Sequence, residues 1–308
     1  LERGVGQNSI SVYITAISGA TFTSPNHNLQ DGDWIILSGI VGVTAADTTS
    51  LNGRSYKVVN PLLNQNTFTL QEFTPPSSAT ATGATFDYDL DQDFAPVYPG
   101  SVEINIGSET FTDVGLNGLL VGTLGSTGTI DYNLGTIHIA FTVAIGATTA
   151  YIRVVSINPL QSFANVVTTG TYTGGGYITR ISNVDIQTKY FNFLQSDQSA
   201  RLSRIDFYVG STDGGEFTVD VFADSSNEPV NTPLIDNARS NVVLTSKNQY
   251  QVGNGSENIY RLFCDAIGQT LQLHMYLSDQ QMAVKSISRS NIELNAMIFA
   301  ITKRGRLI

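Results

Sequence analysis

The feature of this sequence that most constrains its fold is a period of two in hydrophobicity that recurs along the whole chain. Valine, isoleucine, leucine and phenylalanine alternate with polar residues in five clear runs, at residues 102–106, 137–143, 205–209, 217–221 and 271–277. Successive side chains of a strand point to opposite faces, so this period is typical of strands that bury one face. We therefore expect an all-β protein.

Turn signals between the runs support this fold class. Dipeptides that permit positive φ are found at Asp31-Gly32, Asn52-Gly53, Asn117-Gly118, Asp213-Gly214 and Asn254-Gly255. With 41% hydrophobic and only 14% charged residues, the chain is too apolar to be disordered and too poor in Lys, Glu and Arg for a helical protein. Strands joined by tight turns build sandwiches and small barrels.

One segment fits two structures. Ile259, Leu262, Phe263, Ala266 and Ile267 have the spacing of an amphipathic helix between Ser256 and Gly268. The same segment also alternates as a strand would. We favour a strand, because Gly268 would then turn the chain into the clear run at 271–277.

The length of 308 residues allows more than one domain. Before Arg153 there are 13 acidic and 3 basic residues, whereas from Arg153 onward there are 13 of each. Boundary signals are a Pro/Ser/Thr/Ala-rich stretch at 74–80 that leads into an acidic segment, and Asn158-Pro159. We expect a small barrel-like module with an acidic linker at 1–90, a hairpin-rich small β-domain at 91–158, and a β-sandwich at 159–308.

Charge and cysteine content exclude several classes of protein. The net charge of −10 argues against specific nucleic-acid binding and against anionic membranes, since phosphate contacts need clustered cations. The single cysteine, Cys264, cannot form an intrachain disulfide or a cysteine-based zinc site. No apolar run has the length of a membrane span and no signal segment opens the chain. We expect a soluble chain without membrane insertion, and a processed or partly represented one, since it starts at Leu1 without Met.

No sequence motif of the common enzyme classes is present. The chain lacks the nucleophile elbow, the phosphate loop, the dinucleotide fingerprint and the zinc-protease motif. His27, His138 and His274 are its only histidines, and we expect structural roles for all three because no nucleophile is marked beside them. Cys264 lies among apolar residues, where a thiol is usually inert. We therefore expect no catalytic residues, no cofactor and no enzyme activity.

Asp87, Asp89, Asp91 and Asp93 are the sharpest candidates for a binding site. In an extended strand they would share one face and present oxygen ligands to a hard cation such as Ca²⁺. A solvated linker is the competing interpretation and the one we favour, because the segment lacks the glycine of a compact Ca²⁺ loop. We therefore predict no metal site.

Three further segments have sequences that could form a binding or modification site. Gly174-Gly175-Gly176 has no helix signal behind it, so we expect a flexible loop and no phosphate cradle. Asn254-Gly255-Ser256 matches a glycosylation sequon, but we favour a hairpin turn. The basic cluster Lys303-Arg304-Gly305-Arg306 is either a solvated terminus or a docking segment for an acidic neighbour.

Residues near the N-terminus resemble a known β-module. His27–Ile35, Ser38–Gly42, Leu51–Val58 and Phe68–Leu70 are similar to the first catalytic-cysteine half-domain of ubiquitin-activating enzymes, a module that recurs in phage tail and neck proteins. The resemblance covers about a fifth of the chain. Asn28 replaces the usual Gly and Thr44–Ser50 is an insertion. No Cys or adenylation motif accompanies the module, so the resemblance implies architecture and not ubiquitin-type chemistry.

Two other segments resemble phage tail components. Residues 99–113, 118–122 and 128–137 are similar to a Gly-Thr-Ile-Asp-Tyr hairpin module of tails and baseplates, and the C-terminal unit is similar to the terminal domains of short-tailed-phage nozzle proteins. The resemblance implies a virion structural protein of the nozzle, neck or tail-tube type, assembled in the host cytoplasm. Its partners would be further copies in a ring, with six-fold symmetry favoured over a trimer, and other tail or neck proteins.

Three functions are compatible with these features of the sequence. In the first, the rings form part of the DNA-ejection channel, and the acidic N-terminal half lines the lumen and repels passing DNA. In the second, the C-terminal sandwich is a host-attachment adhesin that binds a surface glycan through some of the 13 Tyr and 15 Phe residues. A polysaccharide depolymerase is the third, but no spacing places two carboxylates across a cleft.

Overall fold

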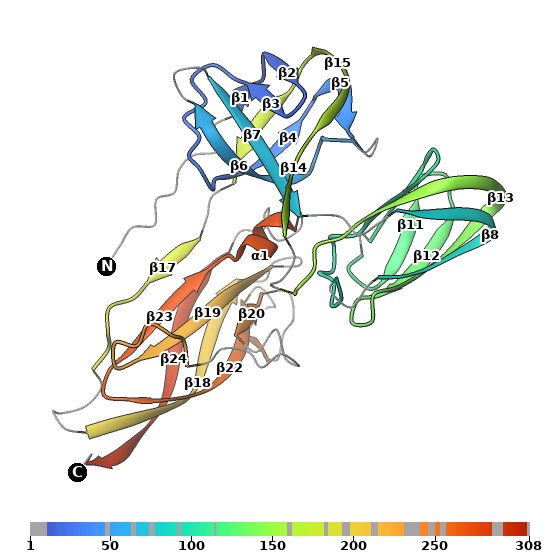
Figure 1. Cartoon of the computed structure of the whole chain (residues 1–308). Coiled ribbons are helices and arrows are strands. Elements are labelled where there is room, and N and C mark those ends of the chain that lie inside the picture. The colour runs from blue at the N-terminus through green and yellow to red at the C-terminus, as the bar shows by residue number, and fades with distance from the viewer. Residues whose placement is uncertain are drawn as a thin grey trace. The chain divides into compact units, whose positions relative to one another are not determined.

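The computed structural model describes residues 11–46, 50–62, 66–73, 78–90, 94–113, 115–158, 162–181, 184–192, 198–210, 215–230, 241–245, 250–252, 257–284 and 292–306. These residues form strands almost throughout, with one short helix, α1 (Asp279–Ala283). The expected all-β class is thereby confirmed. The chain divides into two compact units, one of residues 7–182 and 282–288, the other of residues 1–6, 183–281 and 289–308 (Figure 1).

The larger unit begins with a barrel-like module, here called the N-terminal module. Its strands are β1 (Ser11–Tyr13), β2 (Ala16–Ser18), β3 (Thr21–Thr23), β4 (Trp34–Ser38), β5 (Val41–Ala45), β6 (Ser55–Leu62), β7 (Thr67–Phe73), β14 (Phe163–Asn165), β15 (Thr168–Gly174) and β16 (Tyr177–Arg180). Seven of them form a sheet in the order β1-β16-β4-β6-β7-β3-β2, to which β14 adds by pairing with β7, while β5 pairs with β15.

The core of this module follows from its sequence pattern. In β4 the first four residues, Trp34 to Leu37, are all buried, as the apolar run predicts. Phe22 and Phe68 stack with ring centroids 5.7 Å apart and are almost fully buried. The turns predicted at Asp31-Gly32 and Asn52-Gly53 are present, and both glycines have positive φ. This core holds the strands that position the charged residues discussed below.

The second part of the larger unit, here called the inserted domain, lies between β7 and β14 in the chain. It contains β8 (Ala79–Asp89), β9 (Glu103–Ile106), β10 (Glu109–Thr112), β11 (Leu119–Gly122), β12 (Thr127–Asp131) and β13 (Thr136–Arg153). The sheet β12-β11-β10-β9 curls until both of its edge strands pair with β13, and β8 pairs with β13 along its other side. The hairpin predicted around residues 128–137 is formed by β12 and β13.

The division of the chain differs from the expected units 1–90, 91–158 and 159–308. Strand β8 pairs with β13 and so belongs to the inserted domain, although it was expected in the first unit. Strands β14, β15 and β16 complete sheets of the N-terminal module, although they were expected in the third. The linker and charge signals carry no information about which distant sheet a short strand completes, and residues 74–77 and 159–161 of the two boundary regions lie outside the described residues.

The C-terminal unit contains two four-stranded sheets. One has the order β17 (Asp185–Gln187), β23 (Leu271–Tyr276), β19 (Glu216–Ala223) and β20 (Val242–Leu244); the other has β21 (Tyr250–Val252), β22 (Glu257–Gly268), β18 (Gln198–Gly210) and β24 (Leu294–Arg306). Phe207 of β18 and Phe217 of β19 contact each other edge to face between the sheets, with centroids 5.7 Å apart. Both side chains are almost fully buried, so the sandwich has a common core.

The segment that fitted either a helix or a strand is strand β22. Its residues Leu262 and Ala266 are buried beside β18, whereas Phe263 and Ile267 are exposed. The spacing also matched a helix because apolar residues lie on both faces of this strand, whose pairing with β18 has a bulge between the pairs of Leu202 and Arg204. Gly268 does not close a hairpin, because β22 and β23 belong to different sheets.

Candidate functional site

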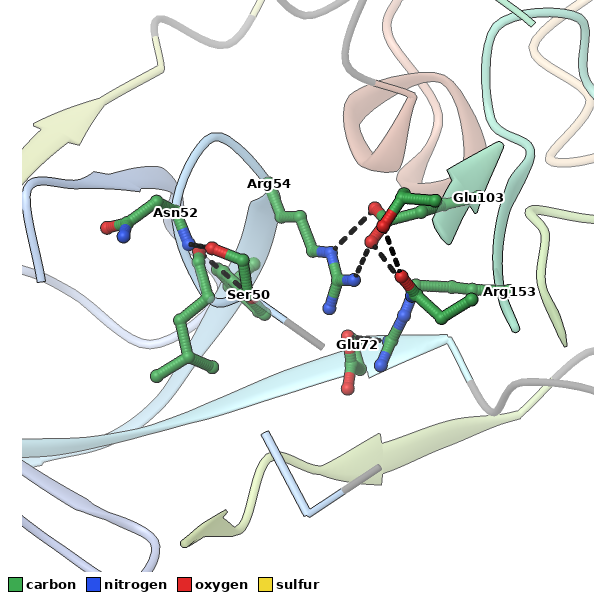
Figure 2. Close-up of polar contacts among 10 residues, drawn as sticks. Ser50, Asn52, Arg54, Glu72, Glu103 and Arg153 are labelled. Atoms are coloured by element: carbon green, nitrogen blue, oxygen red, sulfur yellow. Dashed lines mark hydrogen bonds and ion pairs between the residues drawn. The ribbon is translucent and has the colours of Figure 1, made fainter. Parts of the chain in front are cut away.

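Four charged side chains of the larger unit form two ion pairs where the N-terminal module meets the inserted domain. Arg54, which precedes β6, donates through Nε (3.0 Å) and through Nη2 to the carboxylate of Glu103 on β9. Arg153, at the end of β13, forms an ion pair with Glu72 of β7. Figure 2 shows the four side chains pointing toward one another. We call them the junction quartet.

Local structure fixes each member of the junction quartet. Glu103 and Arg153 are directly opposite each other on β9 and β13. Arg54 follows the Asn52-Gly53 turn, and Asn52 exchanges two hydrogen bonds with the backbone of Ile40, at 2.8 and 3.0 Å. All four side chains are at least three-quarters buried. Since each charge has an opposite charge beside it, the cluster is a connector with no reactive group left over.

An open groove of about 710 Å³ lies on the inserted domain. Asp87, Asp89 and Asp131 line it together with His138 and Tyr132. His138 Nδ1 lies 2.6 Å from Asp87 Oδ1 across the β8–β13 pair. Asp131 Oδ1 accepts hydrogen bonds from the backbone N–H groups of the turn that follows it. Two of the carboxylates therefore already have partners within the domain.

The predicted carboxylate series is only partly described. Asp87 and Asp89 lie on the paired strand β8 and share its outward face, so the solvated linker expected here is wrong for these two residues. Asp91 and Asp93 lie outside the described residues. Within the part of the chain that the structure describes, no three His, Cys, Asp or Glu side chains are grouped as metal ligands. The groove is thus an acidic surface on which one carboxylate is paired with a histidine.

His27 is a buried residue of the N-terminal module. Its ring packs edge-on against Phe68, and its Nδ1 accepts a hydrogen bond of 3.0 Å from the N–H of Leu29. Burial lowers the pKa of this imidazole, and a backbone hydrogen bond with Thr67 opposes that shift. The ring fixes the turn that leads into β4, consistent with a structural role.

His274 belongs to a polar and aromatic surface on the C-terminal unit, which we call the Tyr276 platform. His274 stacks on Tyr276 two residues along β23, with centroids 4.5 Å apart, and its Nε2 lies 2.8 Å from Asp185 Oδ1. Burial raises the pKa of the Tyr276 phenol, and so do the charge of Asp220 and a hydrogen bond with it. Asn241 donates to the same Asp220 carboxylate at 3.0 Å. The platform thus joins flat rings to hydrogen-bonding groups.

Cys264 has the environment expected of an inert thiol. Burial, followed by the charge of Asp265, raises its pKa to about 11, and Sγ lies 3.7 Å from the carbonyl oxygen of Leu202. The thiolate is therefore scarce at neutral pH.

The Gly174–Gly176 segment differs from the flexible loop expected of it. Its three glycines have positive φ; Gly174 ends β15, and Gly175 and Gly176 connect it to β16 without a helix behind them. A Cβ on Gly175 would lie 2.3 Å from the carbonyl oxygen of Gly39. Gly175 is required because two backbone segments pass very close to each other there.

The structure describes only part of the two other segments, the sequon and the basic cluster. Asn254-Gly255-Ser256 lies outside the described residues. Lys303 is exposed on β24, and the backbone of β24 extends as a strand through Arg306. The basic cluster therefore ends a paired strand and does not form a separate tail.

Two buried carboxylates were not singled out in the sequence. Asp113 accepts hydrogen bonds from the N–H groups of Gly100 and Val102 and from the Tyr132 hydroxyl, at 2.6, 3.1 and 3.0 Å. Glu109 accepts from Ser126 through both its N–H and its hydroxyl. Both hold turns of the inserted domain in place. The ion pairs of the junction quartet were not predicted either. One signal was present, because Arg153 is the first basic residue after Lys57 in a strongly acidic stretch and so needed an acidic partner.

Comparison with known proteins gives no relative from which a role could be taken: no family model matches the chain, and no curated protein matches it. In the described part of the chain, no helix is long and apolar enough to span a bilayer.

Proposed function

We propose that this protein is a structural subunit of a bacteriophage tail, of the nozzle, neck or tail-tube type, and that copies of it assemble into a ring around the DNA-ejection channel. The junction quartet carries this proposal. Its ion pairs cross from the N-terminal module to the inserted domain at two places, through Arg54–Glu103 and Glu72–Arg153. The N-terminal module supplies the base of one pair and the acid of the other, so the two ion pairs together hold the module and the inserted domain. A repeating ring needs subunits whose parts are held in this way.

The distribution of charge supports the same proposal. The strand face with Asp87 and Asp89 is exposed on the inserted domain, within the half of the chain that has 13 acidic and 3 basic residues before Arg153. A channel lined by carboxylates would repel the phosphates of passing DNA and prevent it from adhering. In this role the Asp87–His138 pair organises a surface and transfers no proton.

Native mass spectrometry of the full chain, with electron microscopy of the same particles, tests the proposal. We expect a six-fold or twelve-fold ring. A monomer at all concentrations up to those in an assembling virion would overturn it, and a trimer would favour a fibre. Reversing the acidic face with Asp87→Lys and Asp89→Lys tests the channel role, since unchanged DNA ejection would contradict repulsion by that face.

The Tyr276 platform favours a second candidate function, a host-attachment protein that binds a surface glycan. Proteins bind carbohydrates through aromatic rings that stack on the C–H faces of the sugar and through carboxylates and amides that form hydrogen bonds with its hydroxyl groups. Tyr276 and His274 offer the rings and Asp220 a carboxylate on one sheet, and the buried Asn241 orients that carboxylate. A glycan array probed with the full chain, followed by Tyr276→Ala, tests this function. Binding that Tyr276→Ala abolishes would support it, and no binding to any glycan would exclude it.

A further inference from the structure

One outer face of the C-terminal unit exposes large apolar side chains. On the sheet β21-β22-β18-β24, Phe263, Ile298 and Ile267 point away from the core, with 67, 50 and 42% of their surfaces exposed. The register shows that they share this face: Phe263 is opposite Arg204, Ile267 is opposite Arg201, and Ile298 is opposite Asp206. We call this surface the Phe263 face. Exposed apolar groups gathered on one face of a sheet mark an interaction site.

The charged residues of the Phe263 face are arranged like those of an interface. Asp206 lies at the centre of the face and is only 8% exposed. The Nε atoms of Arg204 and Arg261 lie 2.8 and 3.6 Å from its Oδ1. Phenylalanine and arginine are enriched at the centres of protein interfaces, and lysine is depleted there. Arg204 and Arg261 thus hold the Asp206 carboxylate from two neighbouring strands, beside the apolar side chains of the face.

The Phe263 face continues to the edge of its sheet. Ile298 lies on β24, which pairs with β18 on one side and with no other strand of the described residues. Strand β24 has 13 residues, so a long row of backbone N–H and C=O groups borders the apolar patch. Long apolar edge strands of this kind pair with another chain unless they are covered.

The charge of the chain indicates what covers this face. From Arg153 onward the chain has 13 acidic and 13 basic residues, so its net charge of −10 belongs to the first half. On the face itself Arg201, Arg204 and Arg261 form ion pairs with Asp206 and Asp265, which leaves these five residues with one net positive charge. Two copies can therefore approach through their C-terminal units without net repulsion, which their acidic halves would oppose.

From these observations we propose that the Phe263 face, with the adjoining edge of β24, is the surface through which one copy of this chain binds a second copy. The inference rests on the proposed self-assembly and names the surface that performs it. Phe263 and Ile298 are the anchors, and the ion-paired Arg204 and Arg261 lie beside them on the same face.

A substitution on the face tests this assignment. Phe263→Glu places a charge on a side chain that is already mostly exposed, so the core of the sandwich is left unchanged. We expect it to raise the dissociation constant of the assembly at least about 100-fold, the effect of losing an interface anchor. Leu134→Glu is the matched control, because Leu134 is also 67% exposed but lies in the β12–β13 turn of the inserted domain. Native mass spectrometry across a dilution series measures both.

Labelling gives a second measurement that does not depend on disrupting the assembly. In a Cys264→Ser background, Thr302→Cys places a thiol on the exposed side of β24, and Thr127→Cys places one on the exposed side of β12. We expect maleimide to label the Thr302→Cys thiol at least about 10-fold more slowly in the assembled state than after dilution to monomers. The Thr127→Cys thiol should be labelled at the same rate in both states.

The outcomes separate this inference from the proposed function. A wild-type chain that stays monomeric contradicts both. A wild-type chain that assembles, and still assembles after Phe263→Glu, contradicts only the choice of surface. Equal labelling of the Thr302→Cys thiol in both states contradicts that choice as well.

Discussion

Glu103 and Arg153 are directly opposite each other on β9 and β13, yet each forms an ion pair with a residue of the N-terminal module. The two strands bring one acid and one base to the same end of the inserted domain, and the module presents Arg54 and Glu72 to them. Charges alternate within the quartet, so no member lies beside only like charge.

Removing one member of the junction quartet should destabilise the larger unit. Arg54→Ala leaves Glu103 with less compensation in a site that is three-quarters buried. We expect a loss of about 2–4 kcal/mol, somewhat below the cost of breaking a fully buried pair. Chemical denaturation of the full chain measures this loss. The double variant Arg54→Met/Glu103→Leu should recover much of it, and a double variant no more stable than Arg54→Ala would contradict the pairing.

Adding one methyl group to the turn between β15 and β16 should have a large effect. Gly175→Ala places a Cβ 2.3 Å from the carbonyl oxygen of Gly39 at a φ of +78°, and we expect a loss of at least about 2 kcal/mol. Gly146→Ala is the control, because nothing lies within 4 Å of its added Cβ. Equal thermal stability of the two variants would show that the close approach is not obligatory.

The buried imidazole of His27 should make stability depend on pH. Because burial lowers its pKa from 6.5, the unfolded chain takes up a proton as the pH falls below about 6.5, while the folded chain does not. The free energy of unfolding should therefore decrease toward pH 5, by no more than about 1.4 kcal/mol per pH unit for this group. His27→Asn keeps an acceptor for the Leu29 N–H and removes the titration. An unchanged slope between pH 7 and 5 in this variant would contradict the prediction.

The thiol of Cys264 should react slowly in the folded protein. With its pKa raised from 9.0 to about 11, the thiolate fraction at pH 8 falls about 100-fold. Alkylation by iodoacetamide, followed by intact mass, should be slower by at least this factor in buffer than in denaturant. Comparable rates would mean that the side chain is more accessible and more acidic than its surroundings indicate.

Much of the fold was predictable because strand faces are encoded locally. The buried run at Trp34–Leu37 and the alternation at 271–277 both form the strands they predict, and the turns at Asp31-Gly32 and Asn52-Gly53 form as well. These features depend only on residues within a few positions of each other. The local pattern also correctly predicted a strand over residues 259–267.

Long-range pairing was not predictable from the same pattern. The ion pairs Arg54–Glu103 and Glu72–Arg153 join residues 49 and 81 positions apart. Single charges at such separations have no characteristic spacing. Strand β16 has only four residues, too few for a period that would reveal its partners. The Phe263 face was hidden for another reason, since an alternating strand shows which residues share a face but not which face is covered.

The position of β16 has a consequence for how this protein is made. It lies between the edge strand β1 and β4 in the sheet of the N-terminal module. On a ribosome, this sheet therefore cannot be completed before residue 180 emerges, whereas β8 to β13 have all been synthesised before then. Domains generally fold as units during synthesis. The inserted domain should therefore acquire its native structure while the sheet of the N-terminal module still lacks β16.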